Sequence, residues 1–242
     1  MKIIINGAGG RMGKALAAMT QNSPDVEVVG AVDPFVTEPG ILTSLDQCPE
    51  ADCIIDFSNH AGTEGLMGYA VEKKLAVVVC TTGHTQQELD CIREAAGRVP
   101  VFHSGNMSVG IALLTRLARE TAKMFPDADI EIVESHHNQK LDVPSGTALM
   151  LAKAVQEARP EAELVVGRHE NGKRKKSEVG IHSLRMGNTV GIHEVIVNTG
   201  TQVITLKHEA QDRSLFAEGA LTAAAFITGK EPGIYDMKDM VK

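Results

Sequence analysis

The sequence predicts an α/β protein with two domains, one a doubly wound parallel sheet and the other an α+β domain with a mixed sheet. Three observations predict it. Short apolar runs alternate with longer helical patterns through the first half of the chain. A glycine-rich loop joins the first apolar run to the first helical pattern. Later in the chain, strand-like runs follow one another with only short turns between them. Helical crossovers favour parallel pairing, whereas short turns favour antiparallel pairing.

Composition narrows the class of protein. The chain has 242 residues, 43% of them hydrophobic, which suffices for one large domain or two modest ones. A net charge of −7 argues against nonspecific binding of nucleic acid. No apolar run reaches the length of a membrane span, and we expect neither a signal peptide nor a membrane partner, hence a cytoplasmic protein. The cysteine spacing predicts reduced thiols and neither a disulfide framework nor a zinc site.

The chain opens with a pattern typical of a dinucleotide site. An apolar strand over Lys2–Asn6 leads into Gly7-Ala8-Gly9-Gly10-Arg11-Met12-Gly13, and a helical pattern runs from Arg11 to Gln21. A second strand over Val26–Val32 ends in Asp33. Glycines let the backbone approach a pyrophosphate, the helix N-terminus stabilises its charge, and the acid accepts hydrogen bonds from ribose hydroxyls.

The alternation then continues. It predicts strands and helices at the following residues: strands at Asp52–Phe57, Ala76–Cys80 and Val99–His103, helices at Thr63–Lys73, Gln86–Ala96 and Ser108–Phe125. Ligands of such sheets bind at the carboxyl ends of the strands. The segments there are small and polar, as a cofactor-binding loop requires: Phe57-Ser58, Cys80-Thr81-Thr82-Gly83 and Ser104-Gly105-Asn106-Met107.

The stretch from Glu134 to Thr147 concentrates groups that bind anions and transfer protons. It lies between a strand predicted at Asp129–Val133 and a helix predicted at Ala148–Ala158. Two adjacent histidines and a lysine precede a Pro-Ser-Gly-Thr turn. Unpaired N–H groups at a helix start bind carboxylates or phosphates. Taken singly, a His-His pair is more often on the surface and such a turn is only a helix start. Together they predict a site for an anionic small molecule.

The remaining chain predicts a second kind of sheet. Strand patterns cover Ser177–Arg185, Gly191–Asn198 and Gln202–His208, and an apolar helix covers Arg213–Thr228. The basic run at 173–176 is expected to be a solvated loop, because the protein as a whole is acidic.

Over nearly its whole length the chain resembles the 4-hydroxy-tetrahydrodipicolinate reductase (dihydrodipicolinate reductase) family. Its specific signature is Glu134-Ser135-His136-His137 with Lys140 and Asp142 to Thr147, together with the glycine loop. Further matching motifs are Ile181-His182-Ser183-Leu184-Arg185, Val190-Gly191-Ile192-His193-Glu194 and Gly233-Ile234-Tyr235-Asp236-Met237. The resemblance implies NAD(P)H-dependent reduction of a small dicarboxylate in the lysine and diaminopimelate pathway.

The resemblance also implies roles for individual residues. His136 would be the acid/base and Lys140 the proton donor. The substrate carboxylates would be held by His137, Gly146 and Thr147. The cofactor would be lined by Gly7, Ala8, Gly9, Gly10, Arg11, Met12, Asp33, Cys80, Thr81, Thr82, Ser104, Gly105, Asn106 and Met107. Many family members have glycine where Cys80 stands, so the backbone there is expected to differ slightly.

The same resemblance implies a domain division and an assembly. Residues 1–107 and 213–242 would form the dinucleotide-binding domain, and residues 108–212 the substrate-binding and tetramerisation domain. A homotetramer is expected, with contacts through the sheets of the second domain.

Two opposing charges, those of Asp33 and Arg11, are expected to decide the preference between NADH and NADPH. A 2′-phosphate would meet the carboxylate of Asp33, and Pro34 stands where many relatives carry a basic residue. Arg11 is the one nearby cation in the sequence that could meet the phosphate. We therefore expect use of both cofactors, with NADH favoured.

Three other functions were weighed against the residues. Another amino-acid pathway dehydrogenase would share the glycine loop, but nothing else in the chain points to it. A non-catalytic, nicotinamide-sensing regulator would be expected to lack His136 or Lys140, and both are present. A metal hydrolase built on the two histidines would need a carboxylate at ligand spacing, which is missing, so no metal is expected.

Overall fold

The computed structural model describes residues 1–21 and 23–241, which divide into two compact units. The first unit consists of Met1–Ser108 and Ser214–Met240. The second, which we call the inserted unit, consists of Val109–Arg213 with Val241. The chain passes from one unit to the other after Ser108 and after Arg213, in each case one residue later than expected. Lys242 lies outside the described residues.

The first unit is built on a parallel sheet, as predicted. Its strand order is β11-β5-β4-β3-β1-β2, and each neighbouring pair runs parallel. The strands are β1 (Lys2–Asn6), β2 (Glu27–Val32), β3 (Cys53–Asp56), β4 (Ala76–Val79), β5 (Pro100–His103) and β11 (Gly233–Tyr235). Strand β11 was not predicted, and it pairs with β5 at the edge of the sheet.

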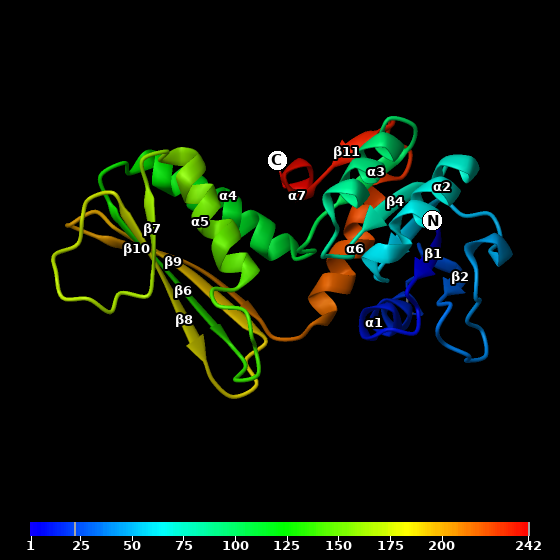
Figure 1. Ribbon diagram of the computed structural model, residues 1–242, viewed down its shortest axis with the longest axis horizontal. Helices are drawn as coiled ribbons and strands as arrows, with labels where there is room; N and C mark the ends of the chain where they lie inside the picture. Colours follow the sequence, from blue (N-terminus) through cyan, green and yellow to red (C-terminus); the bar gives the residue numbers. More distant parts are fainter. Residues whose placement is uncertain (22, 242) are drawn as a thin grey trace. The chain divides into compact units, whose positions relative to one another are not determined.

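Helices cover both faces of this sheet (Figure 1). They are α1 (Arg11–Thr20), α2 (Thr63–Lys73), α3 (Gln86–Ala96) and α6 (Ser214–Ile227). The first unit also contains the short helix α7 (Met237–Met240) and 3-10 turns at Leu45–Gln47 and His60–Gly62. Alternate residues of β5 serve opposite faces. Val101 joins the core under α2 and α3, while the ring of Phe102 meets that of Phe226 on α6. The predicted doubly wound arrangement is therefore confirmed.

The inserted unit contains a mixed sheet, also as predicted. Its order is β10-β9-β6-β8-β7. The strands are β6 (Asp129–His136), β7 (Glu163–Val166), β8 (Glu178–Arg185), β9 (Gly191–Asn198) and β10 (Val203–Ala210). Strand β9 runs antiparallel to β6 and β10, whereas β7 and β8 continue parallel to β6. Strand β7 was not predicted.

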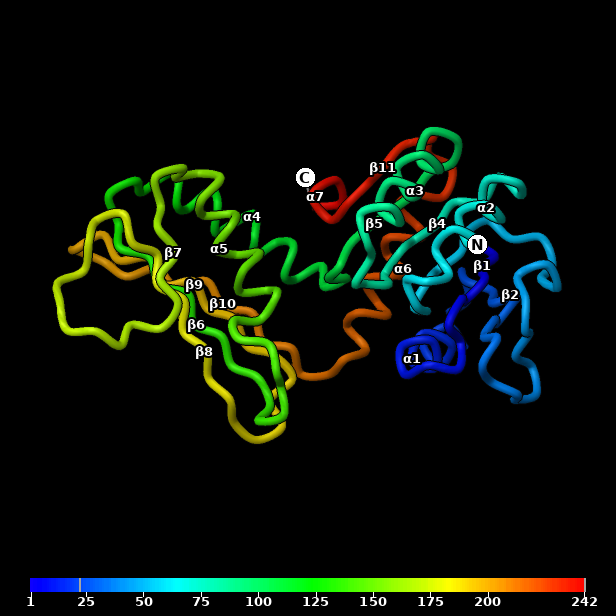
Figure 2. Tube along the Cα trace, viewed as in Figure 1, coloured from blue at the N-terminus to red at the C-terminus, as the bar shows by residue number. Residues whose placement is uncertain are grey.

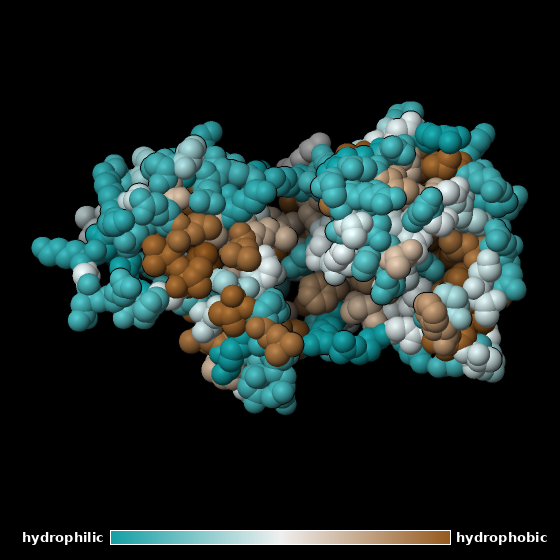
Figure 3. All heavy atoms as spheres, in the orientation of Figure 1, coloured by the Kyte–Doolittle hydropathy of each residue, from teal (hydrophilic) through white to brown (hydrophobic). Residues whose placement is uncertain are grey.

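Two helices, α4 (Val109–Met124) and α5 (Gly146–Ala158), pack against each other over one face of this sheet (Figure 1). Their apolar side chains form one core with Ile130 and Ile132 of β6 and with Val195 and Val197 of β9. The opposite face of the sheet has no helix on it among the described residues. In Figure 3, apolar groups lie exposed over the strands of this unit, and Leu184 and Val203 are exposed apolar residues on the face without a helix.

The stretch before α5 differs from the expectation at both ends. Strand β6 continues through His136 instead of ending at Val133, because β8 pairs with it as far as His136 and β9 as far as Ser135. Helix α5 begins at Gly146, two residues earlier than expected, because the Ser145 side chain accepts a hydrogen bond from the N–H of Ala148 at 3.2 Å. Within the described ranges, no helix is both long and apolar enough to cross a bilayer.

Candidate active site

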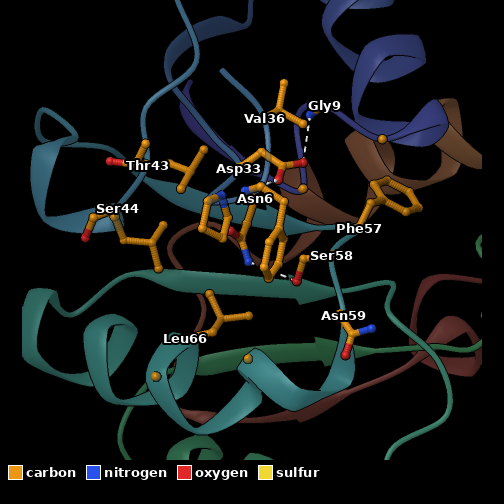
Figure 4. Close-up of a pocket in the computed structure, with 18 of the residues that line it drawn as sticks. Asn6, Gly9, Asp33, Val36, Thr43, Ser44, Phe57, Ser58, Asn59 and Leu66 are labelled. Atoms are coloured by element: carbon orange, nitrogen blue, oxygen red, sulfur yellow. Dashed lines mark hydrogen bonds between the residues drawn. The ribbon is translucent and has the colours of Figure 1, made fainter. Parts of the chain in front are cut away.

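A pocket of about 870 Å³ lies along the glycine loop of the first unit. It opens at the carboxyl ends of β1, β2 and β3, where a doubly wound sheet binds its ligand (Figure 4). Its lining includes Asn6, Gly7, Gly9, Gly10, Asp33, Pro34, Phe35, Val36, Thr43, Ser44, Leu45, Phe57, Ser58, Asn59 and Leu66. The wall is largely apolar, with a few polar groups around the loop. Such a lining fits the adenosine part of a dinucleotide.

Asp33 anchors the end of β2 to the glycine loop. Its Oδ2 accepts a hydrogen bond from the N–H of Gly9 at 3.1 Å, and its Oδ1 accepts one from the N–H of Phe35 at 3.1 Å (Figure 4). A Cβ added at Gly9 would lie 2.4 Å from Cγ2 of Val36, so only glycine fits this close approach. The carboxylate is therefore fixed beside the loop that would hold a pyrophosphate.

A buried carboxylate orders the opposite wall of the pocket. Asp56, at the end of β3, accepts hydrogen bonds from Nδ2 of Asn6 at 2.8 Å and from Oγ of Ser58 at 2.5 Å. Nδ2 of Asn6 also donates to Oγ of Ser58 at 3.1 Å, and both side chains face the pocket (Figure 4). The sequence pointed to Phe57 and Ser58 as a strand-end segment. It held no signal for the apolar wall formed by residues 34–45, because that segment is irregular.

The predicted cofactor residues occupy several places in the first unit. Gly7, Gly9, Gly10 and Asp33 line the pocket, and Ala8 is buried between them. Arg11 and Met12 open helix α1 beside the loop, Arg11 with its side chain exposed. The remaining ones follow β4 and β5 at the same sheet edge but do not line this pocket: Cys80, Thr81, Thr82, Ser104, Gly105, Asn106 and Met107. Among them, the buried hydroxyl of Thr81 has no hydrogen-bond partner.

The second group of predicted site residues lies in the inserted unit, at the end of β6. His136 is buried, and its Nδ1 lies 2.5 Å from Oε2 of Glu134. Arg185 of β8 donates from both terminal nitrogens to the same carboxylate, at 2.8 and 2.9 Å. Burial raises the pKa of Glu134, but the hydrogen bonds from Arg185 and His136 outweigh it and bring the pKa to about 2. Glu134 is therefore an anion, and His136 donates to it.

The environment of His136 favours its neutral form. Burial lowers the pKa of His136, the carboxylate of Glu134 opposes that change, and the charges of Lys140 and Arg185 add to it. Because Nδ1 carries the hydrogen towards Glu134, the lone pair of the neutral ring is on Nε2. A Cβ built at Gly191 would lie 3.1 Å from this Nε2, so the glycine leaves room beside it.

A second buried histidine, His193 of β9, packs edge-on against His136 with ring centroids 5.1 Å apart. Its Nε2 lies 3.2 Å from Oγ of Ser145, the residue that caps α5. Burial and the neighbouring His136 lower the pKa of His193 to about 4, so it is neutral at physiological pH. Sequence reasoning found His193 only as part of a motif and assigned it no role.

Lys140 and His137 lie on the loop that follows β6. Nζ of Lys140 forms an ion pair with Oδ1 of Asp142 at 2.8 Å. The loop is held against the turn between β8 and β9 by a hydrogen bond from the N–H of Asn138 to the carbonyl of Gly187 at 3.2 Å. In Figure 2 the two segments run side by side at one end of the sheet. The lysine is thus carried by an anchored loop.

The loop ends where α5 begins, at Gly146 and Thr147. Gly146 is exposed, and a Cβ built on it would meet no atom within 4 Å. The N-terminus of a thirteen-residue helix favours an anion by its dipole and its first N–H groups. All five predicted catalytic and substrate residues lie between the end of β6 and the first turn of α5. That segment can bind a carboxylate beside an imidazole and an ammonium group. Across residues 1–21 and 23–241, no cluster of three or more His, Cys, Asp or Glu side chains is arranged to hold a metal ion.

Comparison with known proteins identifies the family. A model described as "Dihydrodipicolinate reductase, N-terminus" matches residues 1–107, and one described as "Dihydrodipicolinate reductase, C-terminus" matches residues 110–241. The 4-hydroxy-tetrahydrodipicolinate reductase of Caldanaerobacter subterraneus subsp. tengcongensis is 44% identical, over 100% of this chain and 98% of the relative. That of Clostridium novyi is 41% identical, with the same coverage.

Solved structures agree in fold. The dipicolinate-bound dihydrodipicolinate reductase from Paenisporosarcina sp. TG-14 superposes with a TM-score of 0.85 at 23% identity, covering 99% of both chains. The diaminopimelate dehydrogenase of C. glutamicum, in complex with DAP, reaches a TM-score of 0.61 at 14% identity, covering 99% of this chain and 93% of the other. These likenesses show a shared fold. The sequence relatives and the two family models establish that the chain belongs to the dihydrodipicolinate reductase family.

Proposed function

We propose that the chain catalyses the NAD(P)H-dependent reduction of 4-hydroxy-tetrahydrodipicolinate to tetrahydrodipicolinate, in lysine and diaminopimelate biosynthesis. One observation carries the proposal. Glu134 to Thr147 forms a single anchored segment that presents a buried imidazole, an ammonium group and a helix N-terminus. This combination suits a small dicarboxylate that must be held by its charges and protonated during the reaction. The relatives at 44% and 41% identity carry the name of this reductase.

Each residue of the segment is proposed to have its own role in the reaction. A bound nicotinamide supplies the hydride when the enzyme is loaded. Lys140 donates a proton to the nitrogen side of the reduced ring, where negative charge develops. His136, neutral and with its Nδ1–H held by Glu134, exchanges a proton through Nε2. The first N–H groups of α5, at Gly146 and Thr147, and the side chain of His137 bind the substrate carboxylates.

Both cofactors are proposed to work, with NADH favoured. The pocket presents the carboxylate of Asp33 where a doubly wound sheet binds the ribose of its cofactor. Lys14, one turn after Arg11 on α1, is ion-paired with Glu38 at 2.9 Å, which weakens it as a partner for a 2′-phosphate. Arg11, exposed at the start of α1, is the competing influence.

We further propose that the protein is a cytoplasmic homotetramer. The uncovered face of the sheet in the inserted unit supports the assembly, because half-buried Val133, Ile192 and Ile196 lie there between polar neighbours. Analytical ultracentrifugation of the purified protein measures the mass of the assembly and the number of subunits in it. A monomer at micromolar concentration would contradict the proposal.

The decisive experiment follows the absorbance of NADH and of NADPH during reaction with the freshly made product of the aldolase that precedes this step. Oxidation that depends on both the substrate and the enzyme supports the proposal. A protein that binds the cofactor, as shown by calorimetry, and yet oxidises neither one with this substrate would overturn it. Aspartate-derived amino and keto acids serve as the control substrates for another amino-acid dehydrogenase.

A further inference from the structure

The carboxylate of Glu134 accepts hydrogen bonds from several parts of the predicted site in the inserted unit. Glu134 is fully buried, and each of its carboxylate oxygens accepts two hydrogen bonds. Oε2 accepts from Nδ1 of His136 and from Nη1 of Arg185. Oε1 accepts from Nη2 of Arg185 and, at 3.2 Å, from the backbone N–H of Ser145. One carboxylate thus joins β6, β8 and the start of α5.

We infer that Glu134 and Arg185 are positioning residues of the reductase reaction, fixing together the acid/base histidine, the loop of the proton donor and the carboxylate-binding turn. The inference rests on the proposed function. Neither residue is placed in contact with the substrate. Both act through the groups that they hold.

The first link runs from Glu134 to His136. A carboxylate accepts but cannot donate, so the hydrogen of a neutral His136 is on Nδ1 and the lone pair is on Nε2. Without this partner the ring could carry its hydrogen on either nitrogen and could turn about its own axis. Fixing the tautomer and the ring plane is what an orienting acid does for a catalytic histidine.

The second link runs from Arg185 to the loop of Lys140. Nη2 of Arg185 donates to the backbone carbonyl of Asp142 at 2.8 Å, in addition to its bond with Glu134. Asp142 in turn forms the ion pair with Lys140. The planar guanidinium therefore ties the carboxylate that orients His136 to the backbone that carries the lysine.

The third link runs from Glu134 to the turn that begins α5. The N–H of Ser145 donates to Oε1, while Oγ of Ser145 caps the helix and lies against His193. The two residues that follow, Gly146 and Thr147, are the ones proposed to bind carboxylates. A displaced Glu134 would release this turn together with His136.

A structural role alone accounts poorly for this arrangement. Breaking a buried ion pair destabilises a protein, but an apolar pair of similar size often stabilises it as well or better. The same strand offers a comparison on its opposite face. Glu131 lies 2.8 Å from Nε2 of His182 and accepts from Nε of Arg174 at 3.2 Å. Glu131 therefore contacts a histidine and an arginine, as Glu134 does, but it lies away from the predicted site residues.

The test compares Glu134→Gln with Glu131→Gln in the full-length protein, with the oligomeric state of both variants checked. Glu134→Gln is expected to lower kcat by about 10²–10⁴-fold, as when an orienting acid becomes an amide. Its effect on the affinity for NADH is expected to be less than threefold. Glu131→Gln is expected to stay within about threefold of the parent in kcat. Equal losses in the two variants would overturn the inference.

Nitrogen-15 NMR of the histidine rings gives a readout that a merely structural role would not move. In the parent, His136 is expected as the Nδ1–H tautomer, and in Glu134→Gln its pKa is expected to fall, because the carboxylate opposes the other influences. The charged and titratable groups facing His136 are Glu134, Arg185 of β8, His193 of β9 and Lys140 of the loop. An Nε2–H tautomer in the parent, or an unchanged pKa in the variant, would overturn the inference.

Arg185→Lys covers the outcome in which Glu134→Gln does not fold. It keeps the charge and removes the two-pronged contact, so kcat is expected to fall at least tenfold, with a smaller loss than in Arg185→Met. Equal activity of Arg185→Lys and the parent would contradict the positioning role. Failure of the proposed function is recognised separately: the parent would then not reduce the substrate at all, while the NMR tautomer of His136 would still report on Glu134.

Discussion

The ammonium group of Lys140 lies 2.8 Å from the carboxylate of Asp142, two residues further along the same loop. The lysine is mostly shielded from solvent, whereas the aspartate is more than half exposed. This ion pair lowers the pKa of Asp142, with burial opposing the change. The partner of Lys140 is therefore an exposed carboxylate, which an incoming substrate carboxylate can replace.

Replacing Lys140 with Met removes the proposed proton donor and keeps most of the side-chain volume. We expect kcat to fall by about 10²–10⁴-fold, the usual contribution of a general acid. Steady-state kinetics with saturating cofactor measure it. Lys153→Met, on the exposed side of α5, is the matched control and should remain within a few-fold of the parent. A Lys140→Met enzyme with near-parental kcat would show that another group supplies the proton.

Gly146→Val tests the carboxylate-binding turn. A Cβ built at Gly146 meets no neighbouring atom within 4 Å, so the new side chain fits the fold and projects into open space at the turn. We expect a substrate KM raised at least tenfold and a Kd for NADH almost unchanged, measured by kinetics and by calorimetry. Gly172→Val, also in open space in the inserted unit, should alter neither value. Equal losses of both affinities would assign the turn a role in the fold.

Cofactor choice tests the carboxylate of Asp33. Like charges a few ångströms apart disfavour NADPH by about 1–2 kcal/mol after partial screening, so NADH should have the higher kcat/KM at low salt. Asp33→Asn keeps an oxygen that can accept from the N–H of Gly9 and removes the charge. It should shift the ratio of kcat/KM values towards NADPH by about tenfold. A parental preference for NADPH above tenfold would instead mean that Arg11 decides the choice.

Acid should weaken the inserted unit through His193. Its pKa of about 4 in the folded protein lies below the 6.5 of an exposed histidine, so the unfolded chain binds the proton more readily. The stability is complete above pH 6.5 and is lost as the pH falls towards 4, by a free energy of unfolding on the order of 3 kcal/mol. Urea unfolding at several pH values measures this. His193→Asn, which cannot titrate, should flatten the pH dependence over this window, and an unchanged slope would exclude His193 as its source.

Gly13→Ala tests the contact between α1 and the glycine loop. A Cβ there would lie 2.2 Å from the carbonyl oxygen of Gly7 and 2.7 Å from Cα of Ala8, both of them backbone atoms. We expect a loss of several kcal/mol in the free energy of unfolding. Gly68→Ala, in open space on α2, should stabilise by up to about 1 kcal/mol, because alanine favours a helix interior. A Gly13→Ala protein as stable as the parent would show that the loop adjusts freely.

The sequence predicted the sheets well wherever strands were apolar and bounded by helices or turns. It missed β7 and β11, which have four and three residues and lie at sheet edges. Such short runs become strands because a neighbour offers hydrogen bonds, which local propensity does not reveal. The end of β6 was placed too early for the same reason, since Glu134, Ser135 and His136 are polar and are held extended by β8 and β9.

The sequence also indicated one part of the candidate site more readily than the other. His136, Lys140 and Gly146 share one stretch of chain, so a common anion site for them could be proposed from their proximity. Arg185 and His193 reach the same place through strand register, as in the pairing of His136 with Arg185. That register depends on the whole sheet. The local sequence of β8 or β9 therefore did not predict that Arg185 and His193 lie beside Glu134.

The first unit is formed by two separate segments of the chain, so it cannot be completed until the second segment has been translated. Helix α6 lies against β3, β4 and β5, and β11 completes the edge of the parallel sheet beside β5. Both are translated after Val109–Arg213, a continuous stretch that forms all of the inserted unit except Val241 and can fold as it leaves the ribosome. Until then the part of the sheet formed by β3, β4 and β5 lacks its cover on the side of α6, while α1 already lies over β1 and β2. A chain that ends at residue 213 should therefore contain a protease-resistant inserted unit beside a protease-sensitive N-terminal half.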